Sequence, residues 1–204
     1  MKKIVAIVVL LGLFSCSEKE VQLPQAEVSV LKDIVDHSPI YMFFEIQNKK
    51  DTIIDVNRKN SISSTNWVFN IDKRLPLKLV IPEVIKLQEK KANSAHSKKD
   101  AIDVFSYSDS IGKNLAFFPF TDVKYKLDKE FSKFFIKKHA TEYTPYHNFT
   151  INFNKKNVIT IDGLEVDRDE FVPFIKEFSD FTNDGKLIML HLNFDKNLSY
   201  GDYL

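Results

Sequence analysis

The chain has 204 residues, of which 44% are hydrophobic and 28% charged, and its formal net charge is +1. A net charge so close to zero gives no field that would favour nucleic acid or an acidic substrate as a partner. The 18 Phe and 7 Tyr are ample material for a hydrophobic core, and the single cysteine excludes a disulfide framework within the chain.

The N-terminus predicts a lipoprotein signal peptide over residues 1–15. Lys2 and Lys3 give it a positive start, and the apolar run at 4–14 is too short to cross a hydrocarbon core of about 30 Å as a helix. The sequence LFSC at 13–16 has the form of a lipoprotein signal-peptidase site, after which the cysteine becomes the new N-terminus. Cys16 is therefore the predicted lipidation site. The alternative is an ordinary cleaved signal with an incidental cysteine.

Acylation would hold the protein on the outer or the cytoplasmic membrane, facing the periplasm or the cell surface. Several acyl chains anchor a protein durably, which one chain does not. Residues 16–36 are predicted to be the acylated cysteine and its tether, because SEKEVQLPQAE (17–27) has no apolar period. Ser17, Glu18 and Glu20 also resemble the acidic export signal of surface-displayed lipoproteins in some Gram-negative lineages.

Residues 37–126 are predicted to form a first α+β unit. The β-rich runs IYMFFEI (40–46) and TIIDV (52–56) predict two strands. Further along, two prolines place a helix at about 82–91, and after a polar loop at 92–100 a strand follows at 101–108.

Residues 148–204 are predicted to form a second α+β unit. It has strands at 148–154 and 186–194 and a hairpin turn at Asp162-Gly163. Asp167 and Glu170 have the spacing of a capping box, and one buried helical stripe follows it, made of Phe171, Phe174, Ile175, Phe178 and Phe181.

The two units share a sequence pattern. The segment VNRKNSISSTNWVFNID (56–72) resembles FNKKNVITIDGLEVD (153–167), and each is followed by a predicted helix and then a strand. We interpret this as two degenerate β-turn-β-α-β units; the alternative is two unrelated α+β stretches. The predicted fold class is α+β, a mixed or antiparallel sheet with helices on one face.

Residues 127–147 are predicted to be an amphipathic connecting helix. In LDKEFSKFFIKKHATEY (127–143), Leu127, Phe131, Phe134 and Phe135 fall on one face and the lysines fall elsewhere. Such a helix either docks on a sheet or lies on a membrane surface.

Candidate site residues are few. The five histidines have no zinc-ligand spacing, and the five glycines form no phosphate-binding motif. Asp162, with Asp167 and Asp169, either binds a divalent cation or serves in turns and caps, and the spacing is not that of an EF-hand. Trp67 is either a core anchor or an exposed recognition residue. The candidate binding residues are Trp67, Asp162, Asp195 and Tyr200, and no catalytic residue, metal ligand or cofactor is predicted.

The C-terminal stretch resembles the periplasmic domain of the ExbD/TolR family of biopolymer-transport proteins. The resemblance is carried by ITIDGLEV (159–166), Phe171 and Ile175, LIML (187–190), Asp195 and YGD (200–202). Subunits of that family work with proton-driven motors through an acid in a transmembrane helix, and residues 4–14 contain no Asp or Glu. The family domain also continues past its YG through a helix and a strand. What the resemblance implies here is a small α+β domain that docks envelope proteins or cell wall through strand edges and grooves.

The sequence therefore predicts a lipid-anchored envelope protein that acts as a non-catalytic binding or adaptor module, associated with biopolymer transport. Its partners would be the membrane, through the anchor, and envelope proteins or cell wall, with no role for nucleic acid. Two alternatives are an envelope hydrolase with an acidic site assembled by folding, and a membrane-surface protein that uses residues 127–139.

Overall fold

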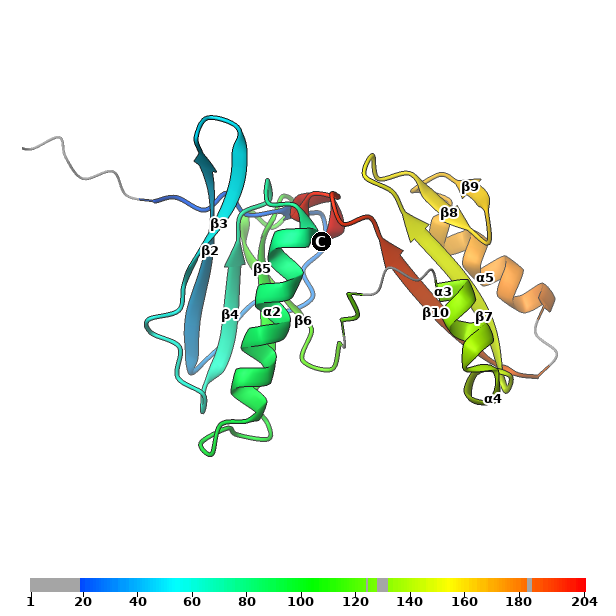
Figure 1. Cartoon of the computed structure of the whole chain (residues 1–204), viewed down its shortest axis with the longest axis horizontal. Coiled ribbons are helices and arrows are strands. Elements are labelled where there is room, and N and C mark those ends of the chain that lie inside the picture. The colour runs from blue at the N-terminus through cyan, green and yellow to red at the C-terminus, as the bar shows by residue number, and fades with distance from the viewer. Residues whose placement is uncertain (1–18, 124, 128–131, 183–184) are drawn as a thin grey trace, which may run out of the picture.

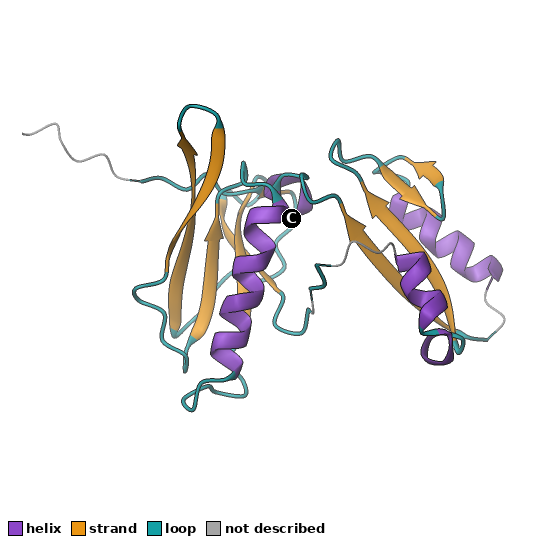
Figure 2. Ribbon diagram, in the orientation of Figure 1, coloured by secondary structure: helices purple, strands orange, loops and turns teal. Residues whose placement is uncertain are grey.

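The computed structural model describes residues 19–123, 125–127, 132–182 and 185–204, and its fold is α+β, as predicted (Figure 1). The chain forms two units, and each is built on its own mixed sheet, with six strands in the first and four in the second. Figure 2 shows the long helix beside the first sheet and shorter helices around the second. Cys16 and the predicted signal peptide lie outside the described residues. Within the described residues, no helix has both the length and the apolar character to span a membrane.

The strands of the first unit are β1 (Gln25–Ala26), β2 (His37–Gln47), β3 (Asp51–Asn57), β4 (Asn66–Ile71), β5 (Asp103–Asp109) and β6 (Asn114–Pro119). Their order is β1-β5-β4-β2-β3, and β6 pairs with the other side of β5. β2, β4 and β5 run parallel, whereas β3 returns antiparallel to β2. The strands predicted at 40–46, 52–56 and 101–108 are thus confirmed, and β3 lies at one edge of the sheet.

The helix α2 (Leu77–Ala92) covers one face of the first sheet and starts earlier than the predicted 82–91. The N–H groups of a first helical turn have no partner within the helix. Here Leu77 and Lys78 donate theirs to the carbonyls of Leu198 and Lys196, at 3.0 and 2.8 Å. Because these distant carbonyls stabilise an early start, Pro82 lies inside the helix, where it gives up one backbone hydrogen bond.

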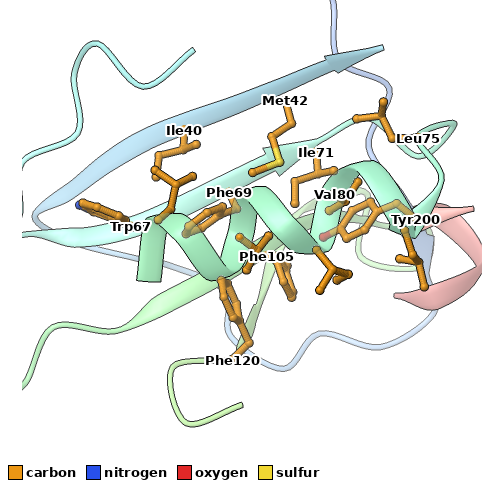
Figure 3. Packing of buried hydrophobic residues seen from close by; sticks show 14 of the residues in the cluster. Ile40, Met42, Trp67, Phe69, Ile71, Leu75, Val80, Phe105, Phe120 and Tyr200 are labelled. Carbon is orange, nitrogen blue, oxygen red and sulfur yellow. The ribbon is translucent and has the colours of Figure 1, made fainter. Parts of the chain in front are cut away.

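The core of the first unit lies between this helix and the sheet (Figure 3). The rings of Phe105 and Phe120 stack with centroids 3.7 Å apart, and Phe69 meets both edge-on. The short C-terminal helix α6 (Tyr200–Tyr203) returns from the second unit and completes this core. The fully buried members are Ile40, Met42, Trp67, Phe69, Ile71, Leu75, Val80, Val84, Leu87, Leu198 and Tyr200.

The second unit contains α3 (Ser132–Lys138), α4 (Ala140–Tyr143), β7 (Tyr146–Phe153), β8 (Ile159–Ile161), β9 (Leu164–Val166), α5 (Phe171–Thr182) and β10 (Leu187–Phe194). Its sheet has the order β10-β7-β8-β9, with β10 parallel to β7. The predicted hairpin is confirmed: Asp162 and Gly163 both have positive φ, 46° and 95°, as a tight turn between β8 and β9 requires.

The predicted stripe of α5 is only partly buried. Phe171, Phe174 and Ile175 pack on the sheet, but Phe181 is almost fully exposed. β8 and β9 have three residues each, about 10 Å, whereas the helix has 12 residues and is about 18 Å long, so its last turn extends past them. The expected capping box is also wrong, because Glu170 donates its N–H to the Asp167 carbonyl in a turn and the helix begins only at Phe171.

The two units share the order strand, strand, helix, strand, but their pairing differs. β8 and β9 form an antiparallel hairpin, whereas residues 58–65 connect β3 to β4 as a loop and β4 pairs parallel with β2 and β5. Asp72, the expected counterpart of Asp167, is fully buried and lies before α2. The resemblance between 56–72 and 153–167 is therefore one of element order and not of strand pairing.

The predicted connecting helix is two short helices, α3 and α4, that meet at His139. Tyr143 contacts His191 of β10, and Ser132 hydrogen-bonds to Asn193, so these helices lie on the face of the sheet opposite α5. Neither helix has a fully buried residue, and Leu127 and Phe134 are exposed; Phe131 lies outside the described residues.

The segment predicted to be a tether is part of the first unit from Lys19 onward. Gln22 donates its N–H to Asp72 and accepts one from Lys73, and β1 pairs parallel with β5. β5 continues beyond the end of β4, and β1 takes up the free backbone groups on that side. The polar sequence at 19–26 is therefore held by main-chain and side-chain partners, distant in sequence, that composition alone does not reveal.

Candidate functional site

Trp67 is a core residue and does not form an exposed recognition surface. Its side chain is fully buried between α2 and the sheet (Figure 3). Its indole Nε1 donates to the carbonyl of Ile62 at 2.8 Å, and Lys91 Nζ lies 4.9 Å from the ring centroid. The alternation around Trp67 places it on the α2 side of β4, which is why the bulky ring is inside.

Tyr200 is also buried and does not reach a binding surface. Its ring meets Phe105 edge-on at 5.6 Å, and burial raises the pKa of its hydroxyl well above the ordinary value. That hydroxyl has no hydrogen-bond partner among the described residues. Tyr200 therefore anchors the C-terminal segment in the first unit.

Asp162 and Asp195 serve in turns and are not brought together. Asp162 Oδ1 accepts the N–H of Thr150, and Asp195 Oδ1 accepts the N–H of Asn197 at 2.7 Å. Asp162 lies on the β8 side of β7, whereas Asp195 follows β10 on the other side. In the part of the chain that the structure describes, no three potential ligands of the His, Cys, Asp or Glu type gather as a metal site would need.

The buried carboxylates all have partners within the fold. Arg74 donates to both oxygens of Asp72, at 2.8 and 2.7 Å, and Lys91 donates to Asp103 at 2.6 Å. Asp109 accepts the Ser29 hydroxyl at 2.5 Å and the N–H groups of the turn that follows it. Each of these groups stabilises a turn or a helix–strand junction.

The carboxyl ends of the parallel strands are where open sheets of this kind bind ligands. Here the C-terminal segment occupies that place, because residues 196–198 supply the partners of the first α2 N–H groups. What remains is an open depression of about 410 Å³ lined by Pro24, Gln25, Lys73, Arg74, Ser199, Gly201 and Asp202. Arg74 is paired with Asp72 and stacks 4.4 Å from the Phe44 ring centroid, so its charge is already engaged.

The surface best suited to binding is the outer edge of β10. No other described strand pairs with this edge. Ile188, Leu190 and Leu192 lie on the same face as buried Phe149 and Ile151, yet they are 38%, 45% and 52% exposed. α5 lies over the β8 and β9 side of the sheet and leaves β10 uncovered (Figure 1).

The sequence predicted β10 as a strand but not the exposure of its apolar side chains. Its sequence LIMLHLNF has eight residues and no charge, which is typical of a strand covered on both faces. Sequence spacing does not report where α5 lies, so this edge could not be recognised as open. Comparison with family models, with curated proteins and with solved structures found no match to this chain.

Proposed function

We propose that this protein is a lipid-anchored bacterial envelope protein that acts as a non-catalytic binding or adaptor module, in association with biopolymer transport. The LFSC sequence at 13–16 supports acylation of Cys16. The observation that carries the binding role is the open, apolar edge of β10.

An unpaired strand edge presents N–H and C=O groups that an extended segment of another protein can satisfy. Soluble proteins usually protect such edges with lysine, proline or a bulge. β10 contains no lysine or proline. Its exposed Ile188, Leu190 and Leu192 offer apolar contacts to alternate side chains of an added strand. The proposed partner is therefore an envelope protein that contributes an extended, alternately apolar segment.

The resemblance to the ExbD/TolR family points to the same mode of docking. Most of its residues fall on β8, the turn at Asp162, β9, α5 and β10 of the second unit, whereas YGD (200–202) lies on α6, which packs in the first unit. The proposed edge belongs to the second unit. The motor activity of the family is not part of the proposal.

Two measurements test this function. Mass spectrometry of the native protein should find a mature N-terminus at Cys16 that carries fatty acyl groups. The mature protein, immobilised and exposed to envelope extract, should capture an envelope protein that crosslinks to β10. Leu190→Lys should abolish this capture, and Leu164→Lys should not, because Leu164 is also exposed but lies on β9 at the other edge of the same sheet. Equal capture by all three proteins, or recovery of no envelope component, would contradict the role of β10.

The second candidate function, a membrane-surface protein that uses residues 127–139, has one observation in its favour. Phe134 of α3 is 55% exposed and Leu127 is exposed nearby in sequence, as on a helix that meets a membrane surface. Phe135, however, packs against His139 and Tyr143. Binding of a Cys16→Ser protein to lipid vesicles, lost on Phe134→Asp, would support this function over the adaptor role.

A further inference from the structure

The chain that follows Cys16 is fastened to one edge of the first sheet. Lys19 Nζ lies 2.5 Å from Glu45 Oε1 and 2.6 Å from Asp55 Oδ2, and 5.8 Å from the ring centroid of Phe43. Glu45 belongs to β2 and Asp55 to β3, the edge strand. Gln22, three residues on, is bound to Asp72 and Lys73.

This attachment leaves a very short connection to the predicted anchor. Only Ser17 and Glu18 separate Cys16 from Lys19. An extended chain advances at most about 3.6 Å per residue, so the Cα atoms of Cys16 and Lys19 are at most about 11 Å apart. An acylated Cys16 lies at the headgroup level, and the part of the fold nearest to Lys19 must then lie beside the bilayer.

Lys19 lies against the face of β2 and β3 that points away from α2, and β3 is the free edge of the sheet on this side. Two basic pairs flank this strand: Lys49 and Lys50 in the turn before it, and Arg58 and Lys59 directly after it. Arg58 also lies 3.8 Å from Glu83 of α2, so the three lysines carry most of the unpaired charge. Lys49, Lys50 and Lys59 are exposed, and no ion-pair partner of theirs lies among the described residues.

Basic side chains outnumber acidic ones on this surface, where Lys19, Lys49, Lys50, Arg58 and Lys59 accompany Glu45, Asp51 and Asp55. Lys19 pairs with both Glu45 and Asp55, which leaves Asp51 as the acid next to the Lys49–Lys50 turn. Ile46, at the end of β2, is 62% exposed and adds an apolar side chain beside the lysines. A surface with several lysines and an apolar tip complements anionic lipid headgroups.

We propose that the β3 edge, from Ile46 to Lys59, lies against the bilayer and that its basic pairs bind anionic lipid headgroups. This orientation rests on the proposed acylation of Cys16. The anchor then acts as a positioning device as well as a tether. Figure 1 shows β3 and the second unit at opposite ends of the molecule, so the same orientation points β10 away from the lipid and toward envelope partners.

The test uses the acylated protein in vesicles that contain phosphatidylglycerol. Cys16 is the only cysteine, and its thiol is acylated in this protein. A thiol-reactive fluorophore therefore labels only a cysteine that is introduced elsewhere. Gln47→Cys places the label beside the Lys49–Lys50 turn, and Ser97→Cys places it on the exposed loop after α2 as a control. A quencher attached to lipid headgroups should quench the label at 47 several-fold more than the label at 97.

Charge reversal separates electrostatic docking from mere proximity. Lys49→Glu with Lys50→Glu should clearly reduce quenching at 47, and so should neutral phosphatidylcholine vesicles, whereas unchanged quenching would show that the lysines do not bind the headgroups. The matched control, Lys155→Glu with Lys156→Glu, changes an equivalent exposed lysine pair in the second unit and should have no effect. Equal quenching at the two positions in a protein with acylated Cys16 would overturn the orientation alone, whereas an unacylated Cys16 would overturn the anchor and the orientation together.

Discussion

Lys91 Nζ lies 2.6 Å from Asp103 Oδ1, and each side chain is more than nine-tenths buried. The pair joins the last turn of α2 to the first residue of β5, and the ammonium also lies over the Trp67 ring. Burial raises the pKa of Asp103 above its ordinary value of 3.8, while the hydrogen bond and charge of Lys91 act in the opposite direction.

Replacing Lys91 by methionine should destabilise the fold strongly. It leaves the Asp103 carboxylate buried without its cation, which typically costs about 3–5 kcal/mol of unfolding free energy. The double change Lys91→Met with Asp103→Leu removes both charges and should recover most of the loss, because apolar pairs of similar volume replace buried ion pairs well. Urea unfolding of the three proteins measures this, and a Lys91→Met protein as stable as the wild type would contradict it.

The Lys91–Asp103 pair also predicts how the stability of the Lys91→Met protein depends on pH. With a raised pKa, folded Asp103 keeps its proton to higher pH than the unfolded chain, so the stability it contributes falls as pH rises from 3.8 through the folded pKa. Without Lys91 that pKa rises further, so Lys91→Met should lose stability over a pH range that extends higher than in the wild type. The Asp103→Leu variant should lack this dependence.

Tyr200→Phe should preserve or slightly increase stability. The hydroxyl is buried without a partner among the described residues, and such a group costs about 1–3 kcal/mol of desolvation. Tyr200→Ala removes a fully buried ring and should cost about 3–5 kcal/mol. Tyr203→Phe is the control, because its hydroxyl lies 3.1 Å from that of Tyr125 and its loss should cost about 1 kcal/mol. A clear loss of stability in Tyr200→Phe would show that its hydroxyl has a partner.

What the sequence predicted correctly is mostly local. The turn at Asp162-Gly163 depends on two adjacent residues, and the predicted strands depend on short apolar runs. Both could therefore be predicted from the sequence. The start of α2 was not, because it depends on the carbonyls of residues 196 and 198 at the far end of the chain. Lys91 looked like any solvated lysine in the run EKK, since only folding places Asp103 beside it. The 19–26 segment looked like a tether because its partners are backbone groups of β5 and the side chain of Asp72.

The first unit should unfold more easily in the Leu198→Ala protein, although Leu198 follows β10 of the second unit. Leu198 is fully buried in the core under α2, and truncating such a side chain costs about 2–5 kcal/mol. Leu190→Ala is the matched control, because Leu190 is half exposed and a surface change of this kind costs about 0.5 kcal/mol or less. Hydrogen exchange of α2 amides should accelerate in the Leu198 variant alone. Unchanged α2 protection would show that the C-terminal segment does not support this helix.

Asp72→Ala should release the N-terminal segment that follows Lys19. The side chain is fully buried and accepts hydrogen bonds from the backbone of Gln22 and Arg74 and from the Arg74 guanidinium, so its removal should cost about 1.5–3 kcal/mol. Amides of residues 20–26 should then exchange faster, and those of β7 in the second unit should not change.

The charge state of Asp72 gives this release a pH dependence. Burial acts to raise the pKa of Asp72, but the hydrogen bonds from Arg74 and Gln22 outweigh it and hold the pKa below 3.8. A depressed pKa contributes stability that is present above 3.8 and is lost as pH falls through the folded pKa. Wild-type protection of residues 20–26 should therefore hold from neutral pH down to about 4 and weaken below it, whereas Asp72→Ala should lack protection across the whole range. Protection of this segment that is equal in both proteins at pH 7 would mean that Asp72 does not fasten it. In that case Lys19 and β1 alone would hold this segment on the first sheet, and Lys19→Ala, not Asp72→Ala, would be the change that releases it.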